Sequence, residues 1–318
     1  MTAGRALFVV GEVVTDVVAL HEGPLAPHTD TAARIAVRPG GAGANAAAWA
    51  AAGGAEVRLL ARAGADSADW HRAELAAAGV TARLAVDPQA PTAVVISLVD
   101  GRAERTLVTD GGAAVRLGPE DWDEALLDGA ARLHLSGYQL LSGPGRRLAA
   151  LAVPAARAAG LPVSADPAST GFLQRVGPAA VREAFAGVGL LLPNRAEAHL
   201  LAGTGDPAAA AERLSALHGE AVVKLGAQGA LVAAGGRVLA RVPGVPGVAA
   251  VDSTGAGDAF AGGLLAARLA GADPVEAARA GCRAGAAAVA LVGARPPAGR
   301  AGRDVPDRSA PTGRAAVR

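Results

Sequence analysis

The chain has 318 residues, 51% of them apolar, which is enough to bury a sizeable core in one large α/β domain or two smaller ones. Its 30 basic and 29 acidic side chains leave a net charge of +1, which gives no overall field to recruit nucleic acid or an anionic membrane. We therefore expect the partner to be a small molecule.

The cysteine content and the N-terminal region predict a protein of the reducing cytoplasm. Cys282 is the single cysteine, so no internal disulfide can form. The N-terminus lacks a basic region followed by an uninterrupted apolar stretch, which argues against a secretory signal. The first apolar segment, residues 7–20, contains Glu12 and Asp16 and is too short and too charged to span a bilayer.

Short β-branched runs alternate with alanine-rich helical stretches along most of the chain. The runs that predict buried strands are residues 7–10, 57–61, 133–136, 163–165, 190–192 and 221–225. This alternation predicts a mostly parallel sheet covered by helices. Residues 31–38 and 92–109 break the pattern and predict exposed strands of a small separate sheet. From residue 297 the chain is rich in Pro, Gly and Arg, which predicts a disordered tail.

Several common classes of enzyme lack their defining residues. Lys224 is the only lysine and is followed by Leu225, whereas a Walker A loop needs Gly-Lys-Ser/Thr, so a P-loop NTPase is excluded. The histidines show no metal-ligand spacing, and no Gly-x-Ser-x-Gly elbow is present. Zinc-enzyme and hydrolase functions therefore lack support.

The first glycine-rich segment, residues 39–48, follows a candidate strand and opens a helix. Gly41 and Gly43 are followed by Ala46, which fits a dinucleotide-binding Gly-x-Gly-x-x-Gly/Ala turn weakly. The segment does not open the first βαβ unit, and no acidic residue ends a strand about 20 residues later, so a dinucleotide-dependent oxidoreductase is the weaker alternative. The side-chain amide of Asn45 suits the recognition of vicinal hydroxyl groups, which need both a donor and an acceptor.

Two motifs in the second half of the chain each allow two interpretations. Asn194 and Glu197, at the start of a helix, have the spacing of a capping box and also suit Mg²⁺ held by one carboxylate through water. Lys224 ends a strand and precedes a turn with Gly226 and Gly229. It is either a solvated surface residue or a contact to a nucleotide phosphate.

The strongest signal is the string VDSTGAGDAF, residues 251–260, which runs into an apolar helical stretch. A glycine-rich turn at a helix N-terminus directs backbone N–H groups and the positive end of the helix dipole at one spot, which binds anions. The carboxylate of Asp258 in the first turn can take a proton from an attacking hydroxyl. The alternative is that Asp258 only caps the helix.

Together these segments resemble the two signatures of the ribokinase-like (PfkB) carbohydrate and nucleoside kinases. The resemblance implies a Rossmann-like three-layer α/β/α domain with a small β-sheet lid, spanning residues 1–296, with lid strands at about 15–38 and 90–110 and a tail at 297–318. It implies that Asp258 is the general base. The backbone amides of Gly255, Ala256 and Gly257 would form the anion hole for the transferring phosphoryl group.

The resemblance also implies the remaining binding residues, with ATP and Mg²⁺ as cofactors. The acceptor contacts are Asp16, Gly40, Gly41 and Asn45, joined by Arg105 on the second lid segment unless it is simply an exposed strand arginine. The nucleotide contacts are Asn194, Glu197, Lys224, Gly226 and Gly229, with Glu197 holding Mg²⁺ through water. Asp252 and Thr254 stand where relatives ligate a monovalent cation such as K⁺. Exposed lid strands of this fold often pair between subunits, which predicts a homodimer.

Departures from the family patterns bear on the acceptor. Val14 replaces the asparagine typical of ribokinase proper, and Thr170 stands where kinases of carboxylated sugars carry an arginine. Aromatic residues make up only 3% of the chain, so Trp49, Tyr138 and Phe172 are the few candidates for a nucleobase platform. The sequence predicts an ATP-dependent kinase of a hydroxymethyl group on a sugar or sugar-like molecule. A nucleoside kinase of the same family, for example one acting on pseudouridine, and a non-catalytic sugar sensor are the alternatives.

Overall fold

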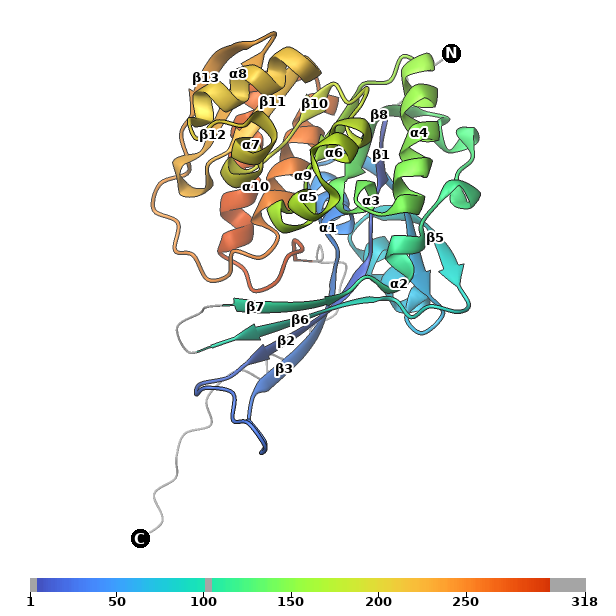
Figure 1. Cartoon of the computed structure of the whole chain (residues 1–318), viewed down its shortest axis with the longest axis vertical. Helices are drawn as coiled ribbons and strands as arrows, with labels where there is room; N and C mark the ends of the chain where they lie inside the picture. The colour runs from blue at the N-terminus through green and yellow to red at the C-terminus, as the bar shows by residue number, and fades with distance from the viewer. Residues whose placement is uncertain (1–4, 101–104, 298–318) are drawn as a thin grey trace.

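The computed structural model describes residues 5–100 and 105–297, and its main element is a nine-stranded sheet (Figure 1). Its strands, in spatial order, are β13 (Arg237–Val242), β12 (Ala230–Ala234), β11 (Glu220–Lys224), β10 (Leu190–Leu191), β9 (Val163–Asp166), β8 (Ala130–Ser136), β1 (Ala6–Val10), β4 (Glu56–Gly64) and β5 (Val80–Asp87). The strands from β5 to β11 run parallel, and β12 and β13 are antiparallel additions. The carboxyl ends of the parallel strands therefore share one edge, where we expect the site.

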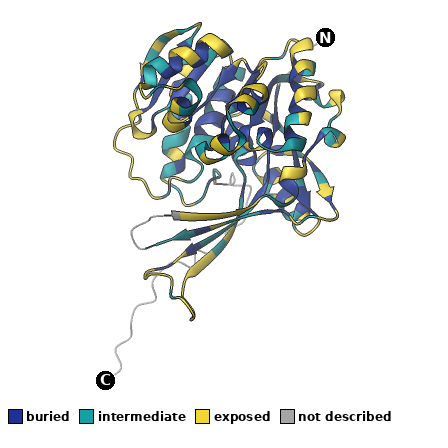
Figure 2. Cartoon of the chain, viewed as in Figure 1, coloured by how far each residue is buried: buried dark blue, intermediate teal, exposed yellow. Residues whose placement is uncertain are grey.

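Helices cover both faces of this sheet, giving three layers. One face carries α1 (Ala42–Ala52), α2 (Ala68–Ala77), α9 (Ala256–Leu269) and α10 (Pro274–Val289). The other carries α4 (Gly143–Ala158), α5 (Thr170–Val176), α6 (Pro178–Ala184), α7 (Arg195–Ala202) and α8 (Pro207–His218). Strand β1 serves both cores, because Leu7 and Val9 pack on the first face while Phe8 and Val10 pack on the second, as the two-residue period of a strand requires. Figure 2 shows the strands buried between the layers.

The shorter helical segments connect these elements. They are α3 (Gly137–Leu140) after β8 and the 3₁₀ turns η1 (Gly112–Arg116), η2 (Pro119–Asp121), η3 (Glu124–Leu127) and η4 (Gly226–Gln228). Among the described residues, no helix is long and apolar enough to cross a membrane.

A second, four-stranded sheet stands apart from the main one and forms the lid (Figure 1). Its order is β3 (Arg34–Gly40), β2 (Val14–Leu20), β6 (Ala93–Val99) and β7 (Arg105–Asp110). Asp16 lies directly opposite Arg38 on β3 and Val95 on β6, so these side chains share one face. The next row, Val37, Val17 and Ile96, lies on the opposite face.

The architecture predicted from the sequence is confirmed. Each of the six predicted buried strands coincides with β1, β4, β8, β9, β10 or β11, except that the ranges 190–192 and 221–225 each extend one residue beyond the strand. The lid strand expected over residues 31–38 starts at Arg34 and continues to Gly40, and the segment expected over 92–109 divides into β6 and β7. The tail predicted from residue 297 lies outside the described residues except for Pro297, so that boundary remains a prediction.

Candidate active site

The glycine-rich turn before α9 has the conformation that its sequence predicts. Gly255 has a φ of 73°, in the left-handed region that favours glycine. A Cβ atom at this position would lie 2.5 Å from the Cβ of Ala294, so the turn also has no space for a side chain. The backbone N–H of Ala256 donates to the carbonyl of Ser253 over 3.4 Å, whereas those of Gly255 and Gly257 have no such partner within the described ranges. The turn therefore presents donors at the positive end of α9.

Asp258 lies in the first turn of α9 and is held by α1. The Nδ2 atom of Asn45 donates to its Oδ2 over 2.9 Å, a contact between residues far apart in the sequence. Burial raises the pKa of Asp258 to about 7, against the effect of the Asn45 hydrogen bond. A carboxyl with a pKa near neutral pH is well matched to take a proton from a hydroxyl group.

The first glycine-rich turn packs closely against the strands that precede it. A Cβ on Gly40 would lie 2.1 Å from Oδ2 of Asp16, and one on Gly41 would lie 2.3 Å from the carbonyl oxygen of Glu12. Gly41 also has a φ of 98°. The close approach brings Asp16 of β2 beside the turn that opens α1. Burial raises the pKa of Asp16 to about 6, partly offset by the positive charge of Arg295.

Arg295 contacts the first glycine-rich turn and the helix that follows it. It was not predicted from the sequence as a site residue. Its Nε donates to Oδ1 of Asn45 over 3.3 Å, and its Nη2 donates to the carbonyl of Gly40 over 3.0 Å. Asn45 thus accepts from Arg295 and donates to Asp258, which fixes the orientation of its amide. Arg295 stands at the edge of the segment predicted to be a tail, and nothing in the local sequence indicates its role.

The predicted nucleotide residues meet across the carboxyl ends of β9 and β11. The ammonium group of Lys224 forms an ion pair with Asp166. Burial works against the charge of Lys224, yet Asp166 and Glu197 hold its pKa above the ordinary value. A Cβ on Gly257 would lie 3.4 Å from Nζ of Lys224, so the lysine reaches the turn before α9. Asp166 was not predicted as a site residue, although its place at a strand end was a usable signal.

Asn194 and Glu197 form the capping box that their spacing allows. Oδ1 of Asn194 accepts from the backbone N–H of Glu197 over 2.9 Å, and Oε2 of Glu197 accepts from the backbone N–H of Asn194 over 2.8 Å. Burial, together with the negative charge of Asp166, raises the pKa of Glu197 to about 7. The structural interpretation is therefore confirmed, and a role in binding Mg²⁺ remains a prediction.

The other predicted residues shape the surrounding loops. Gly226 and Gly229 have φ values of 61° and 89° in the turn between β11 and β12, where a Cβ on Gly229 would lie 2.0 Å from the carbonyl oxygen of Val242. Asp252 accepts from the backbone N–H of Thr254 over 2.9 Å and from that of Gly293 over 3.0 Å. No group of three or more His, Cys, Asp or Glu residues in the described ranges is arranged to hold a metal ion.

Arg105 begins β7, and its side chain lies outside the described part of the chain. Glu12 is buried at the end of β1, where its Oε1 accepts from the backbone N–H of Gly43 over 3.1 Å. Burial raises the pKa of Glu12, which was not predicted as a site residue.

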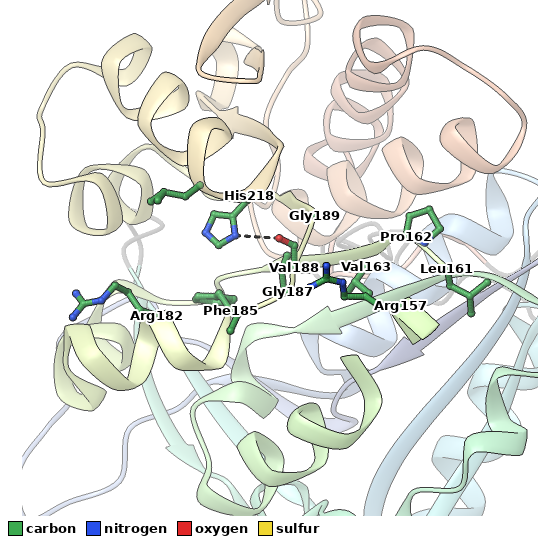
Figure 3. A pocket seen from close by; sticks show the side chains of 12 residues that line it. Arg157, Leu161, Pro162, Val163, Arg182, Phe185, Gly187, Val188, Gly189 and His218 are labelled. Atoms are coloured by element: carbon green, nitrogen blue, oxygen red, sulfur yellow. Dashed lines mark hydrogen bonds between the residues drawn. The ribbon is translucent and has the colours of Figure 1, made fainter. Parts of the chain in front are cut away.

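A pocket of about 590 Å³ lies elsewhere, at the amino ends of the strands (Figure 3). Its lining includes Pro162 and Val163 at the start of β9, and Gly189 just before β10. His218, at the end of α8, faces the carbonyl of Val188 over 3.1 Å. None of the residues predicted from the sequence as site residues line this pocket.

Comparison with known proteins gives a consistent family assignment. A model described as pfkB family carbohydrate kinase matches residues 5–299. A 2-dehydro-3-deoxygluconokinase from Thermoproteus tenax is 32% identical over 277 residues, covering 85% of this chain and 83% of that protein.

Solved structures agree with this match. A putative Ribokinase II from E. coli in complex with ATP and Mg²⁺ has a TM-score of 0.81 and 27% identity, covering 91% of this chain and 94% of that one. A PfkB protein from Polaromonas sp. JS666 has a TM-score of 0.77 and 29% identity, covering 90% and 96%. The two sheets and the helical layers described above are thus those of the ribokinase-like fold.

Proposed function

Since the chain belongs to the pfkB family of carbohydrate kinases, we propose that it transfers the γ-phosphate of ATP to a hydroxymethyl group of a sugar or sugar-like molecule. The observation that carries this proposal is the placement of Asp258. Its carboxyl group, with a pKa raised to about 7 by burial, lies in the first turn of a helix whose N-terminal turn presents backbone N–H donors. Base and anion-binding donors therefore stand beside each other, as phosphoryl transfer requires.

In this mechanism Asp258 takes the proton of the acceptor hydroxyl as that oxygen attacks the γ-phosphate. Asn45 holds Oδ2 of Asp258, which fixes the carboxylate in one orientation. The backbone N–H groups of residues 255–257 and the helix dipole stabilise the charge on the transferring phosphoryl group. Asp16, Gly40, Gly41 and Asn45 orient the acceptor through its hydroxyl groups, and Arg105 contacts it from the lid.

The nucleotide lies along the edge formed by Asn194, Lys224, Gly226 and Gly229, with the Lys224 ammonium directed to a phosphate. The negative charge of Asp166 raises the pKa of Glu197, and such a pair of carboxyl groups suits a site for a divalent cation. Mg²⁺ fits a site without a complete protein cage because it keeps waters and phosphate oxygens as ligands, and when bound it neutralises phosphate charge. Asp252, with Thr254, would hold a monovalent cation such as K⁺ next to the glycine-rich turn before α9.

The assembly is a cytoplasmic homodimer that pairs through the lid. Val37, Ile96 and Val108 form part of one row across the lid sheet and are 59%, 38% and 55% exposed. An exposed apolar face supports association with a second copy, and so do the edge strands β3 and β7, which each pair on one side only among residues 5–100 and 105–297.

A nucleoside acceptor is the second candidate, favoured by one aromatic pair. The rings of Tyr138 and Phe172 lie edge to face with centroids 5.7 Å apart. Burial raises the pKa of Tyr138, and the negative charges of Glu12 and Asp258 act in the same direction. Such rings can support a nucleobase.

The test is acceptor-dependent ADP release with Mg·ATP against pentoses, hexoses, sugar phosphates, sugar acids and nucleosides, with the product identified as a phosphate monoester. Turnover of a sugar class supports the primary proposal, and turnover confined to nucleosides supports the alternative. Silence across the panel, with ATP binding verified by thermal shift, would favour a protein that kept the fold and lost the chemistry.

A further inference from the structure

Arg295 is a cation built into the acceptor side of the site. Its guanidinium group is fixed by the carbonyl of Gly40 and the side chain of Asn45. Gly40 lies against the carboxylate of Asp16, and Asn45 donates to Asp258. Arg295 therefore stands beside the residues that orient the acceptor, separated from the proposed base by one side-chain amide.

The groups around the guanidinium of Arg295 in the described part of the chain leave one of its donors unused. Within residues 5–100 and 105–297 Arg295 forms no ion pair, and its Nη1 atom is buried without a hydrogen-bond partner. Burial lowers the pKa of Arg295 to about 10, with Glu74 and Asp16 acting in the opposite direction, so the group is still charged at neutral pH. An unmatched buried donor is costly, and a carboxylate or phosphate oxygen would satisfy it.

A second arginine approaches the same segment of chain. Nη1 of Arg38 donates to the carbonyl of Val292 over 3.1 Å, while its Nε atom is buried without a partner. Arg38 lies opposite Asp16 in the lid sheet and thus on the same face. Arg38 and Arg295, each with an unused guanidinium donor, therefore lie near Asp16, the carboxylate proposed to orient the acceptor.

We propose that Arg295 determines acceptor specificity by binding an anionic group, so that the substrate is a sugar bearing a carboxylate or a phosphate ester. This inference rests on the proposed function, because the acceptor in question is the molecule whose hydroxyl Asp258 deprotonates. It also accounts for Thr170, which replaces the arginine expected for carboxylated sugars. Arg295 supplies an equivalent fork of donors from a different segment.

Pairs of acceptors with and without the anionic group measure how much that group contributes to recognition of the sugar. The carboxylate pair is 2-dehydro-3-deoxygluconate and its C1 amide, and the phosphate pair is fructose 1-phosphate and fructose. Each pair keeps the hydroxymethyl group at C6, and because fructose has a second one at C1, only its phosphorylation at C6 is counted. We expect wild-type protein to favour one anionic member over its neutral partner by about 10- to 100-fold in kcat/KM, as for a hydrogen-bonded charge pair. The pair that shows this preference identifies the anion.

Variants then assign the preference to Arg295. Arg295→Gln should abolish the preference because KM rises by a larger factor for the anionic member than for its neutral partner, and Arg295→Lys should keep part of the preference because the charge remains. Arg237→Gln, an exposed arginine on β13, is the matched control and should retain the full preference. Thermal unfolding checks that each variant is folded. The comparison of anionic with neutral acceptors uses wild-type protein, so it remains informative even if a variant misfolds.

The results that would contradict the role of Arg295 differ from those that would contradict phosphotransfer. Equal turnover of neutral and anionic members, or equal losses for both in Arg295→Gln, would overturn the role of Arg295 and leave phosphotransfer intact. Stabilisation of wild-type protein by an anionic member that is lost in Arg295→Gln, without any turnover, would uphold Arg295 and contradict the kinase mechanism. Neither turnover nor stabilisation by either anion would overturn the inference.

Discussion

Three acidic side chains in the site have pKa values well above those of exposed carboxyl groups. Burial raises the pKa of Asp16 to about 6 and those of Glu197 and Asp258 to about 7. A carboxyl whose pKa is higher in the folded than in the unfolded protein favours folding when protonated, and this contribution is lost as the pH rises through the folded-state pKa. At pH 8 these groups are therefore kept ionised at the expense of stability, as is common at functional sites.

This linkage predicts an unusual effect for Asp258→Asn. The amide resembles the protonated carboxyl and can still accept from Asn45, so the variant should unfold at a higher temperature than wild type at pH 8. The difference should narrow as the pH falls below about 7, where wild-type Asp258 becomes protonated in the folded protein, and should close only near pH 4, the ordinary carboxyl pKa. Thermal unfolding at both pH values measures this.

The matched control is Asp273→Asn, at the N-terminus of α10. There the backbone N–H of Glu276 lowers the pKa of the capping carboxylate, so the opposite sign applies and this variant should lose stability at pH 8. Destabilisation of both variants at pH 8 would contradict the assignment of Asp258 as a carboxylate whose ionisation is opposed by burial.

At the level of elements, the glycine turn before α9 illustrates a local requirement that sequence reasoning can find. Gly255→Ala should destabilise the protein by about 2–4 kcal/mol, because the left-handed conformation costs roughly 1–2 kcal/mol and the new methyl group overlaps Ala294. It should also lower turnover, since the N–H donors of the turn are displaced.

Gly271→Ala separates the backbone cost from the packing cost. Gly271 has a φ of 92° just after α9, with open space where a Cβ would lie. This variant should lose only about 1–2 kcal/mol and keep full turnover. Denaturant unfolding and ADP release measure both effects, and equal losses in the two variants would show that the tight contact at Gly255 has no special importance.

The features that the sequence predicted are those encoded within a few neighbouring residues. Strand β1, the turns at Gly41 and Gly255 and the Asn194–Glu197 pair all have local signals of this kind. Arg295 contacts Asn45, which is 250 positions away in the chain, so no local pattern could reveal it. The Asp166–Lys224 pair likewise depends on the alignment of β9 with β11 through β10.

At the scale of the whole molecule, the lid has two different faces. Asp16 and Arg38 lie on one face, while Val37, Val17, Ile96 and Val108 form an apolar row on the other. The two-residue period of the strands produces this division, since adjacent rows point in opposite directions. Figure 2 shows how little of the lid is buried compared with the main body.

This asymmetry predicts that the lid sheets of two copies pack together. Val37→Lys combined with Ile96→Lys should convert the dimer to a monomer, because buried, unpaired charges oppose association. Leu217→Lys, which changes a 75% exposed residue on α8, should leave the dimer intact. Sedimentation velocity measures the mass, and a wild-type monomer at micromolar concentration would contradict the prediction.

Acceptor-dependent ADP release from Asp258→Asn, compared with wild type and Asp273→Asn, shows whether Asp258 is the base of a Mg·ATP-dependent kinase. We expect kcat to fall by about 10²- to 10⁴-fold in Asp258→Asn, with stabilisation by Mg·ATP retained and Asp273→Asn turning over normally. Near-normal turnover by a folded Asp258→Asn protein would contradict the mechanism.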